Sequence, residues 1–114
     1  MVLCGANAYE QKYYLNPEFE GMPSQIKEEL QILCVLYTEE IGGIFTMEFD
    51  EDGNLLLRTN SESNDFMYDE IGSELRIKQL LQDRQELFRS LELYYRVFIK
   101  GEIPEECLED PENA

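Results

Sequence analysis

The residue types best suited to chemistry are scarce in this chain. Its 114 residues include no histidine, so the side chain that titrates near neutral pH and the commonest transition-metal ligand are both missing. Three cysteines, Cys4, Cys34 and Cys107, are too far apart in sequence to form a C-x-x-C metal or redox pair. No phosphate-binding or hydrolase motif occurs. The sequence therefore predicts no catalytic residue, no metal and no cofactor, with Cys34 as a small core residue.

One acidic loop has part of a calcium-binding pattern. Asp50, Asp52 and Asn54 have the spacing of the first three ligands of a calcium loop. The sixth position of such a loop requires glycine and the twelfth a bidentate glutamate, but here they are Leu55 and Ser61. We therefore interpret the segment as a hairpin turn built from Asp, Gly and Asn.

Positive charge is concentrated between residues 76 and 100, which hold six of the nine Lys and Arg side chains. On one continuous helix, four of them would gather within about 40° of one another, opposite the apolar stripe: Lys78, Arg89, Arg96 and Lys100. Such a surface can dock an acidic partner or the chain's own acidic tail. It is also typical of an ordinary solvated helix face.

Arg84 is out of place among its neighbours, because it falls in the middle of the apolar stripe. An unpaired guanidinium in a core would be costly. Three interpretations remain open: the side chain extends to solvent past the core, which we favour; it forms a buried ion pair with Glu29 or Glu40 of the preceding helix; or it forms an anion site.

The net charge excludes several kinds of partner. With 25 acidic and 9 basic side chains the net charge is -16 and the pI is about 4.1, which opposes direct binding to nucleic acid or to an anionic membrane. No apolar stretch approaches the ~20 residues that span a bilayer, and the first residues lack the features of an export signal. We expect a cytoplasmic protein.

The strands that would position these residues are predicted from two-residue alternation. Residues 8–15 predict an aromatic-rich first strand. Residues 45–49 and 55–57 alternate on either side of a turn that contains glycine, which predicts a β-hairpin. A short extra strand at residues 66–68 is a weaker expectation.

The helices are predicted from apolar residues at helical spacing. Residues 24–41 have one apolar face, and the pattern stops at Gly42 and Gly43. A second apolar stripe runs from an N-cap at Asp69 to Gly101, which predicts one long helix.

This β-α-β-β-α order predicts an α+β fold, a two-layer sandwich in which two helices cover a small, mainly antiparallel sheet of three or four strands. We expect residues 1–101 to form a single domain. Residues 102–114 contain six carboxylates and no basic side chain, which predicts a flexible acidic tail.

Four segments together resemble a known family: YYLNPEF at 13–19, IKEELQILCVLYTEEIGG at 26–43, YDEIGSELRIKQL at 68–80 and LELYYRVF at 91–98. The chain is similar over nearly all of residues 4–98 to short acidic bacterial proteins classed as a domain of unknown function. The resemblance implies a bacterial cytosolic protein. It carries over no catalytic or binding residue, because the family has no assigned activity.

These observations favour a non-catalytic cytosolic interaction or regulatory protein with an unidentified protein partner. A homodimer is one candidate assembly, because the chain is rich in tyrosine and a small sheet leaves edges to cover. Three alternatives remain, of which the first is an enzyme without histidine or a recognised motif. A small-ligand-binding domain would show a ligand-induced melting shift, and an acidic nucleic-acid mimic that inhibits a DNA-binding protein would bind its target with steep salt sensitivity.

Overall fold

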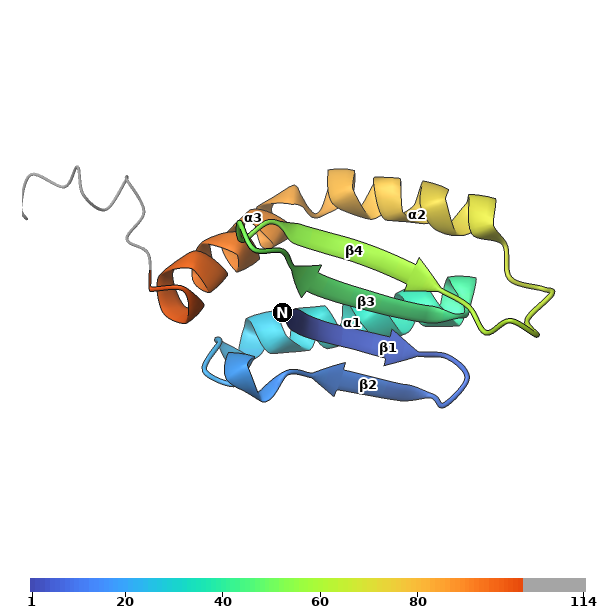
Figure 1. Ribbon diagram of the computed structural model, residues 1–114, viewed down its shortest axis with the longest axis horizontal. Coiled ribbons are helices and arrows are strands. Elements are labelled where there is room, and N and C mark those ends of the chain that lie inside the picture. The colour runs from blue at the N-terminus through green and yellow to red at the C-terminus, as the bar shows by residue number, and fades with distance from the viewer. Residues whose placement is uncertain (102–114) are drawn as a thin grey trace, which may run out of the picture.

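A four-stranded antiparallel sheet forms one layer of the protein (Figure 1). The computed structural model describes residues 1–101, so the predicted tail at 102–114 lies outside the described residues. The strand order is β2-β1-β3-β4, and the strands are β1 (Val2–Asn7), β2 (Lys12–Leu15), β3 (Ile44–Phe49) and β4 (Leu55–Asn60).

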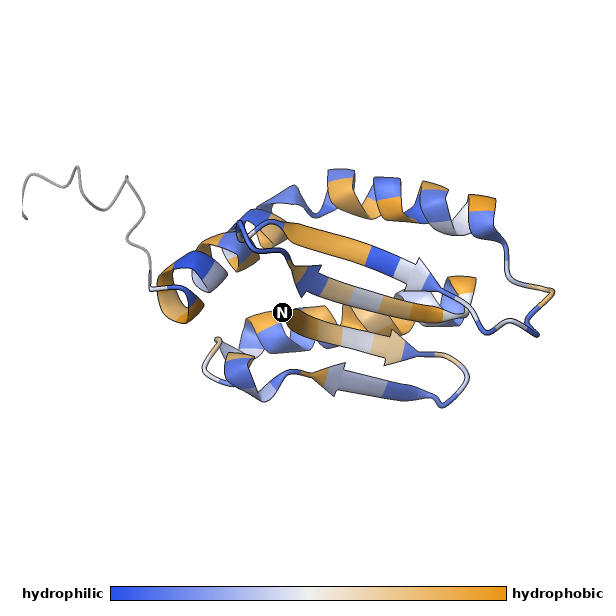
Figure 2. Cartoon of the chain, in the orientation of Figure 1, coloured by the Kyte–Doolittle hydropathy of each residue, from blue (hydrophilic) through white to orange (hydrophobic). Residues whose placement is uncertain are grey.

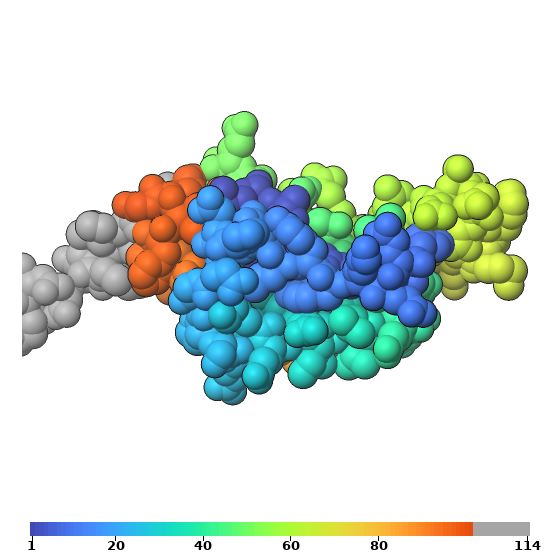
Figure 3. Space-filling model, turned by 90° about the horizontal axis from the view of Figure 1, so that it is seen from below, coloured from blue at the N-terminus to red at the C-terminus, as the bar shows by residue number. Residues whose placement is uncertain are grey.

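The helices form the second layer. They comprise a 3-10 turn, three α-helices and a short π-helix: η1 (Pro17–Phe19), α1 (Ser24–Ile41), α2 (Glu70–Asp83), α3 (Gln85–Tyr94) and η2 (Tyr95–Ile99). Helix α1 lies behind the sheet in Figure 1, and Figure 3 shows residues of β1 and β2 stacked on those of α1. The predicted α+β fold is confirmed.

The core lies between the sheet and α1. One side of each strand faces the core, as the alternating burial of β3 shows. Figure 2 shows apolar residues along β1, β3 and β4. Tyr37 of α1 stacks on Phe45 of β3, with ring centroids 4.4 Å apart. At the other end of the core, Phe49 stacks on Tyr95 at 4.3 Å. Aromatic contacts therefore anchor both ends of the helical layer to the central strand β3.

The prediction of one strand over residues 8–15 is wrong, because the chain forms a hairpin there. Strand β1 occupies residues 2–7, a turn follows in which Gln11 has a φ of 53°, and β2 begins at Lys12. The register of β1 against β3 shifts between Val2 and Cys4. Leu3 and Cys4 are consequently both buried, so a bulge removes the alternation by which sequence patterns reveal a strand.

The extra strand expected at residues 66–68 does not form. Phe66 and Met67 lie in a loop and are 91% and 92% exposed. Neither side chain contributes to the sheet or to the core. The sheet reaches four strands through β1 instead.

The prediction of one continuous helix from Asp69 to Gly101 is also wrong, because the segment forms α2, α3 and η2. Asp69 does cap its start, where the side chain accepts a hydrogen bond from the Gly72 N–H. The helix then breaks at Arg84, whose φ and ψ of -119° and 31° are not helical. Helix α3 leaves in a new direction (Figure 1), and its residues Leu87, Phe88 and Leu91 are buried.

Candidate functional site

Helices α1 and α2 lie side by side on the same face of the sheet and run antiparallel. The Nε atom of Arg76 lies 2.8 Å from an oxygen of Glu40, and near the other end of α1 the Arg84 guanidinium approaches Glu29. Nearer the start of α2, the hydroxyl of Tyr37 donates to the backbone carbonyl of Ser73 at 3.2 Å. Polar contacts therefore bridge the two helices along most of their shared length.

Two hollows lie along this boundary. One of about 630 Å³ surrounds the α2–α3 break, and the other, of about 300 Å³, lies between α1 and α2. Both are lined by Glu29, Asp83 and Arg84, so the ion pair stands between two parts of one depression. We call this depression the interhelix groove; its apolar lining consists of Ile26, Ile32, Leu33, Leu36, Leu80 and Leu87.

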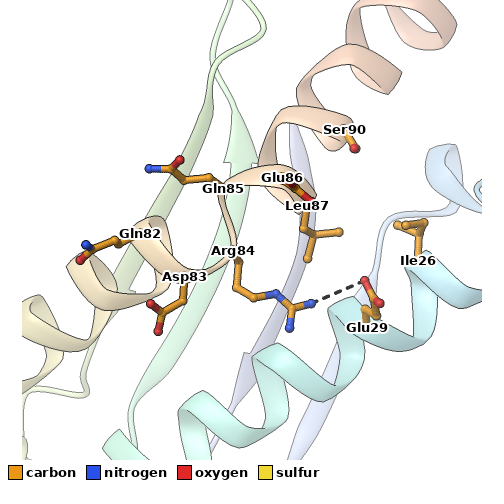
Figure 4. A pocket seen from close by; sticks show the side chains of 9 residues that line it. All are labelled: Ile26, Glu29, Gln82, Asp83, Arg84, Gln85, Glu86, Leu87 and Ser90. Carbon is orange, nitrogen blue, oxygen red and sulfur yellow. Dashed lines mark ion pairs between the residues drawn. The ribbon is translucent and has the colours of Figure 1, made fainter.

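Arg84 is positioned by the break between α2 and α3. Figure 4 shows its guanidinium pointing across the groove toward Glu29, and the nearest nitrogen and oxygen are 3.5 Å apart. The two side chains are 40% and 39% exposed, so the ion pair is accessible to solvent and is not a buried one. Arg84 reaches solvent, as the favoured interpretation expected, and it pairs with one of the two named glutamates, Glu29, although that pair is not buried.

The exposed apolar side chains of the groove were missed by sequence reasoning. Ile32 and Leu36 are 58% and 56% exposed although both line the groove. They lie one turn apart on α1, outside the stripe that packs against the sheet. A pair of large apolar residues at positions i and i+4 beside an already complete apolar face is the signal that could have identified them.

The rim of the groove has excess negative charge. Arg76 and Arg84 are each matched by a carboxylate of α1. Asp83 and Glu86 also line the larger hollow, and neither takes part in an ion pair within residues 1–101. The groove therefore has an apolar floor and an acidic border.

The four basic residues singled out from the sequence do not share one helix face. Lys78 precedes the break at Arg84 and Arg89 follows it, and both are exposed. Arg96 and Lys100 reach back to the β3–β4 turn, where they donate to the Asn54 side chain at 3.4 Å and to a backbone carbonyl at 2.7 Å. The prediction assumed one continuous α-helix with a constant rotation per residue. The break at Arg84 and the π-helix change that rotation, so the four side chains do not cluster.

The β3–β4 turn itself is organised by Asp50. One carboxylate oxygen accepts hydrogen bonds from the backbone N–H groups of Asp52 and Asn54, each at 2.9 Å. The backbone hydrogen bond from Asn54 is the main reason that the pKa of Asp50 lies below its usual value. The carboxylate that would open a calcium loop is therefore engaged in holding a turn.

The core contains a polar group without a partner. The hydroxyl of Tyr13 is buried, and it makes no hydrogen bond to any residue in the described part of the chain. Burial, and then the nearby sulfurs of Cys4 and Cys34, raise the pKa of this phenol well above its usual value. Cys34 is fully buried, so its predicted place in the core is confirmed.

A family described as being of unknown function, DUF6145, matches residues 1–103. The chain belongs to this family. The DUF6145 match includes every strand and helix described above, which agrees with the resemblance found in the sequence. Comparisons with curated proteins and with solved structures give no match. Among the described residues, none of the helices is long and apolar enough to cross a bilayer.

Proposed function

We propose that this protein is a non-catalytic interaction protein that binds a helical segment of a partner protein in the interhelix groove. The observation that carries the proposal is the exposure of Ile32 and Leu36, which line the groove at helical spacing and are each more than half accessible. An amphipathic helix docks by placing apolar side chains at i, i+3 and i+4 into such a groove.

Charge favours a basic partner helix. The groove has Asp83 and Glu86 on its border, and the whole chain has a net charge of -16. A negative surface attracts a basic segment over long range and fixes its orientation once it is bound. The partner segment would therefore combine an apolar stripe with lysine or arginine on both flanks.

The Arg84–Glu29 ion pair would act as an adjustable bridge in the middle of the groove. Its 3.5 Å separation and partial exposure mean that little free energy is lost when it opens, because such accessible pairs contribute about 0 to 1 kcal/mol. A carboxylate from the partner can replace Glu29, and a basic side chain can pair with the released Glu29. Arg84, the one arginine within the apolar stripe, would therefore take part in recognition of the partner.

As part of this proposal, the protein acts in the bacterial cytoplasm, as its resemblance to short acidic bacterial proteins implies. An unidentified protein is its partner, and direct contact with nucleic acid is opposed by the acidic surface. Mimicry of nucleic acid is a competing outcome of the purification below, and binding of a small ligand would be detected separately as a ligand-induced rise in melting temperature.

A direct test uses a fluorescent 18-residue peptide of leucine and lysine with an amphipathic helical pattern. Fluorescence anisotropy should show that Ile32→Ser/Leu36→Ser weakens its binding at least tenfold. The control is Phe66→Ser, which removes a fully accessible apolar side chain from a loop and should leave binding unchanged. Equal binding by the double variant and the original protein would refute the groove as the docking site.

The natural partner can be sought by affinity purification from the native cell, with washes at low and high salt. A partner retained by the original protein and by Phe66→Ser, but lost with Ile32→Ser/Leu36→Ser, would support the proposal. A partner that is lost at high salt, and that the double variant retains as well as the original protein does, would instead favour a nucleic-acid mimic. Contacts between charges alone are screened by salt.

A further inference from the structure

Three sulfur atoms meet in the core between β1, α1 and β3. The Sγ atoms of Cys4 and Cys34 are 3.7 Å apart, and the Sδ atom of Met47 lies 3.7 Å from the first and 3.9 Å from the second. The sulfurs therefore form a nearly equilateral triangle. All three side chains are fully buried, and each comes from a different element of the fold.

The size of this triangle matches the demands of a metal ion. A point equidistant from the three sulfurs lies about 2.2 Å from each, close to the bond of about 2.3 Å that sulfur makes to a zinc ion. Thiolate and thioether ligands favour soft ions such as Cu(I) and zinc, but structural zinc sites use four protein ligands, whereas this triangle offers three sulfurs and so fits Cu(I) better. No set of three His, Cys, Asp or Glu side chains able to hold a metal occurs within residues 1–101, so the thioether is needed to complete the ligand set.

The orphaned hydroxyl of Tyr13 is an independent observation at the same place. Its oxygen is buried and makes no hydrogen bond to any described residue, and the Tyr13 side chain packs against the core cluster that contains Cys4 and Cys34. A neutral thiol is a poor acceptor, but a metal-bound thiolate accepts hydrogen bonds readily. The phenol would then donate to a ligand sulfur, as groups in the second shell of metal sites do.

We propose that Cys4, Cys34 and Met47 form a trigonal binding site for one Cu(I) ion, with Tyr13 donating a hydrogen bond to a bound thiolate. Binding replaces two thiol protons by the ion, which leaves two thiolates, one neutral thioether and two released protons. The copper stays in the Cu(I) state throughout. The site is separate from the interhelix groove, because Cys34 faces the sheet whereas Ile32 and Leu36 face α2.

The test measures Cu(I) binding without oxygen, in competition with a chromogenic Cu(I) chelator, in a Cys107→Ser background that leaves only the two core thiols. Native protein and protein refolded in the presence of Cu(I) should each bind one equivalent, because the site is enclosed and the ion enters through local opening. X-ray absorption should show three sulfur neighbours. Absence of binding in both preparations, or only two sulfur neighbours, would overturn the proposal.

Met47→Leu is the decisive variant, because it keeps the volume of the side chain and removes only the thioether. We expect at least tenfold weaker binding with the fold retained, as checked by circular dichroism. Cys4→Ser and Cys34→Ser should abolish binding, and Tyr13→Phe should weaken it severalfold. Unchanged affinity in Met47→Leu would overturn the trigonal site whatever the cysteine variants do, because the thioether would then not be a ligand.

Discussion

Helix α1 presents two apolar edges that differ sharply in how they are covered. Toward the sheet, Leu30, Cys34 and Tyr37 are at most 1% exposed. Toward α2, Ile32 and Leu36 are more than half exposed, and the neighbouring helix is joined by ion pairs and one tyrosine hydrogen bond. The same helix therefore belongs to a sealed core on one side and to an open boundary on the other.

The difference shows which interactions hold the fold and which are available for binding. Burial of apolar area stabilises in proportion to the surface removed from water, whereas accessible ion pairs contribute little. The α1–sheet contact should therefore account for stability, and the α1–α2 boundary should tolerate change or accept a partner. Substitutions placed on each side of α1 separate these two roles.

The largest effect is expected from shortening a side chain on the sealed edge. Leu30→Ala should lower the free energy of unfolding by about 2 to 5 kcal/mol, because it leaves a cavity in a packed core. Ile32→Ala, two residues along the same helix, should cost less than about 1 kcal/mol. Urea unfolding of both variants measures the contrast, and similar losses in the two would contradict the division of α1 into two edges.

A gain in stability is expected inside the sealed core itself. Tyr13→Phe removes a buried hydroxyl that has no partner in the described structure but is hydrated in the unfolded chain, so the metal-free protein should become about 1 kcal/mol more stable. Tyr14→Phe is the matched control, because Tyr14 is 53% exposed and should change little. A clear loss in Tyr13→Phe would mean that the hydroxyl is held by one of the sulfurs.

A smaller effect is expected at the open boundary. Arg84→Met keeps the aliphatic stem and removes an accessible charge, so the free energy of unfolding should change by less than about 1 kcal/mol. A double-mutant cycle with Glu29→Gln isolates the ion pair, and thermal or urea melts provide the readout. A loss above about 3 kcal/mol would show that the pair acts as a buried one.

The smallest effect concerns pH at the exposed β3–β4 turn. Hydrogen bonds to its carboxylate lower the folded-state pKa of Asp50 below 3.8, so its contribution is complete above the unfolded value and is lost as pH falls through the folded one. Stability measured below about pH 4 should fall less steeply in Asp50→Asn, which keeps an acceptor oxygen but does not titrate. If the free energy of unfolding depended on pH in the same way in Asp50→Asn and in the original protein, Asp50 would make no contribution to the acid sensitivity of the fold.

Regular periodicity made much of the fold predictable from sequence. The predicted helix at 24–41 matches α1, and the predicted hairpin matches β3 and β4 apart from their ends. Strand β1 could not be found in this way, because a bulge at Leu3 and a glycine at position 5 interrupt its alternation. Hydrophobic periodicity reveals a helix or strand only where the same face of that helix or strand is buried along its whole length.

The groove was less predictable, because it depends on how two helices meet. The break at Arg84 has no proline or glycine to announce it, although an arginine within an apolar stripe was a valid sign that the stripe was not continuous. Glu29 and Glu40 were both predicted as candidate partners of Arg84, but only the tertiary structure shows that Glu29 pairs with Arg84 whereas Glu40 pairs with Arg76. The exposure of the Ile32 side chain likewise depends on how α2 lies against α1, which the sequence does not show.

The strand order β2-β1-β3-β4 also constrains how the chain can fold. The two hairpins join neighbouring segments, but the central pairing of β1 with β3 brings Asn7 beside Ile44 across β2 and α1, so it carries the largest loop-closure entropy in the sheet. Gly5 lies in that pairing, where a Cβ atom would come within 2.9 Å of the Phe45 carbonyl oxygen. We predict that this central pairing forms in the rate-limiting step, so that Gly5→Ala slows refolding more than it speeds unfolding in stopped-flow measurements.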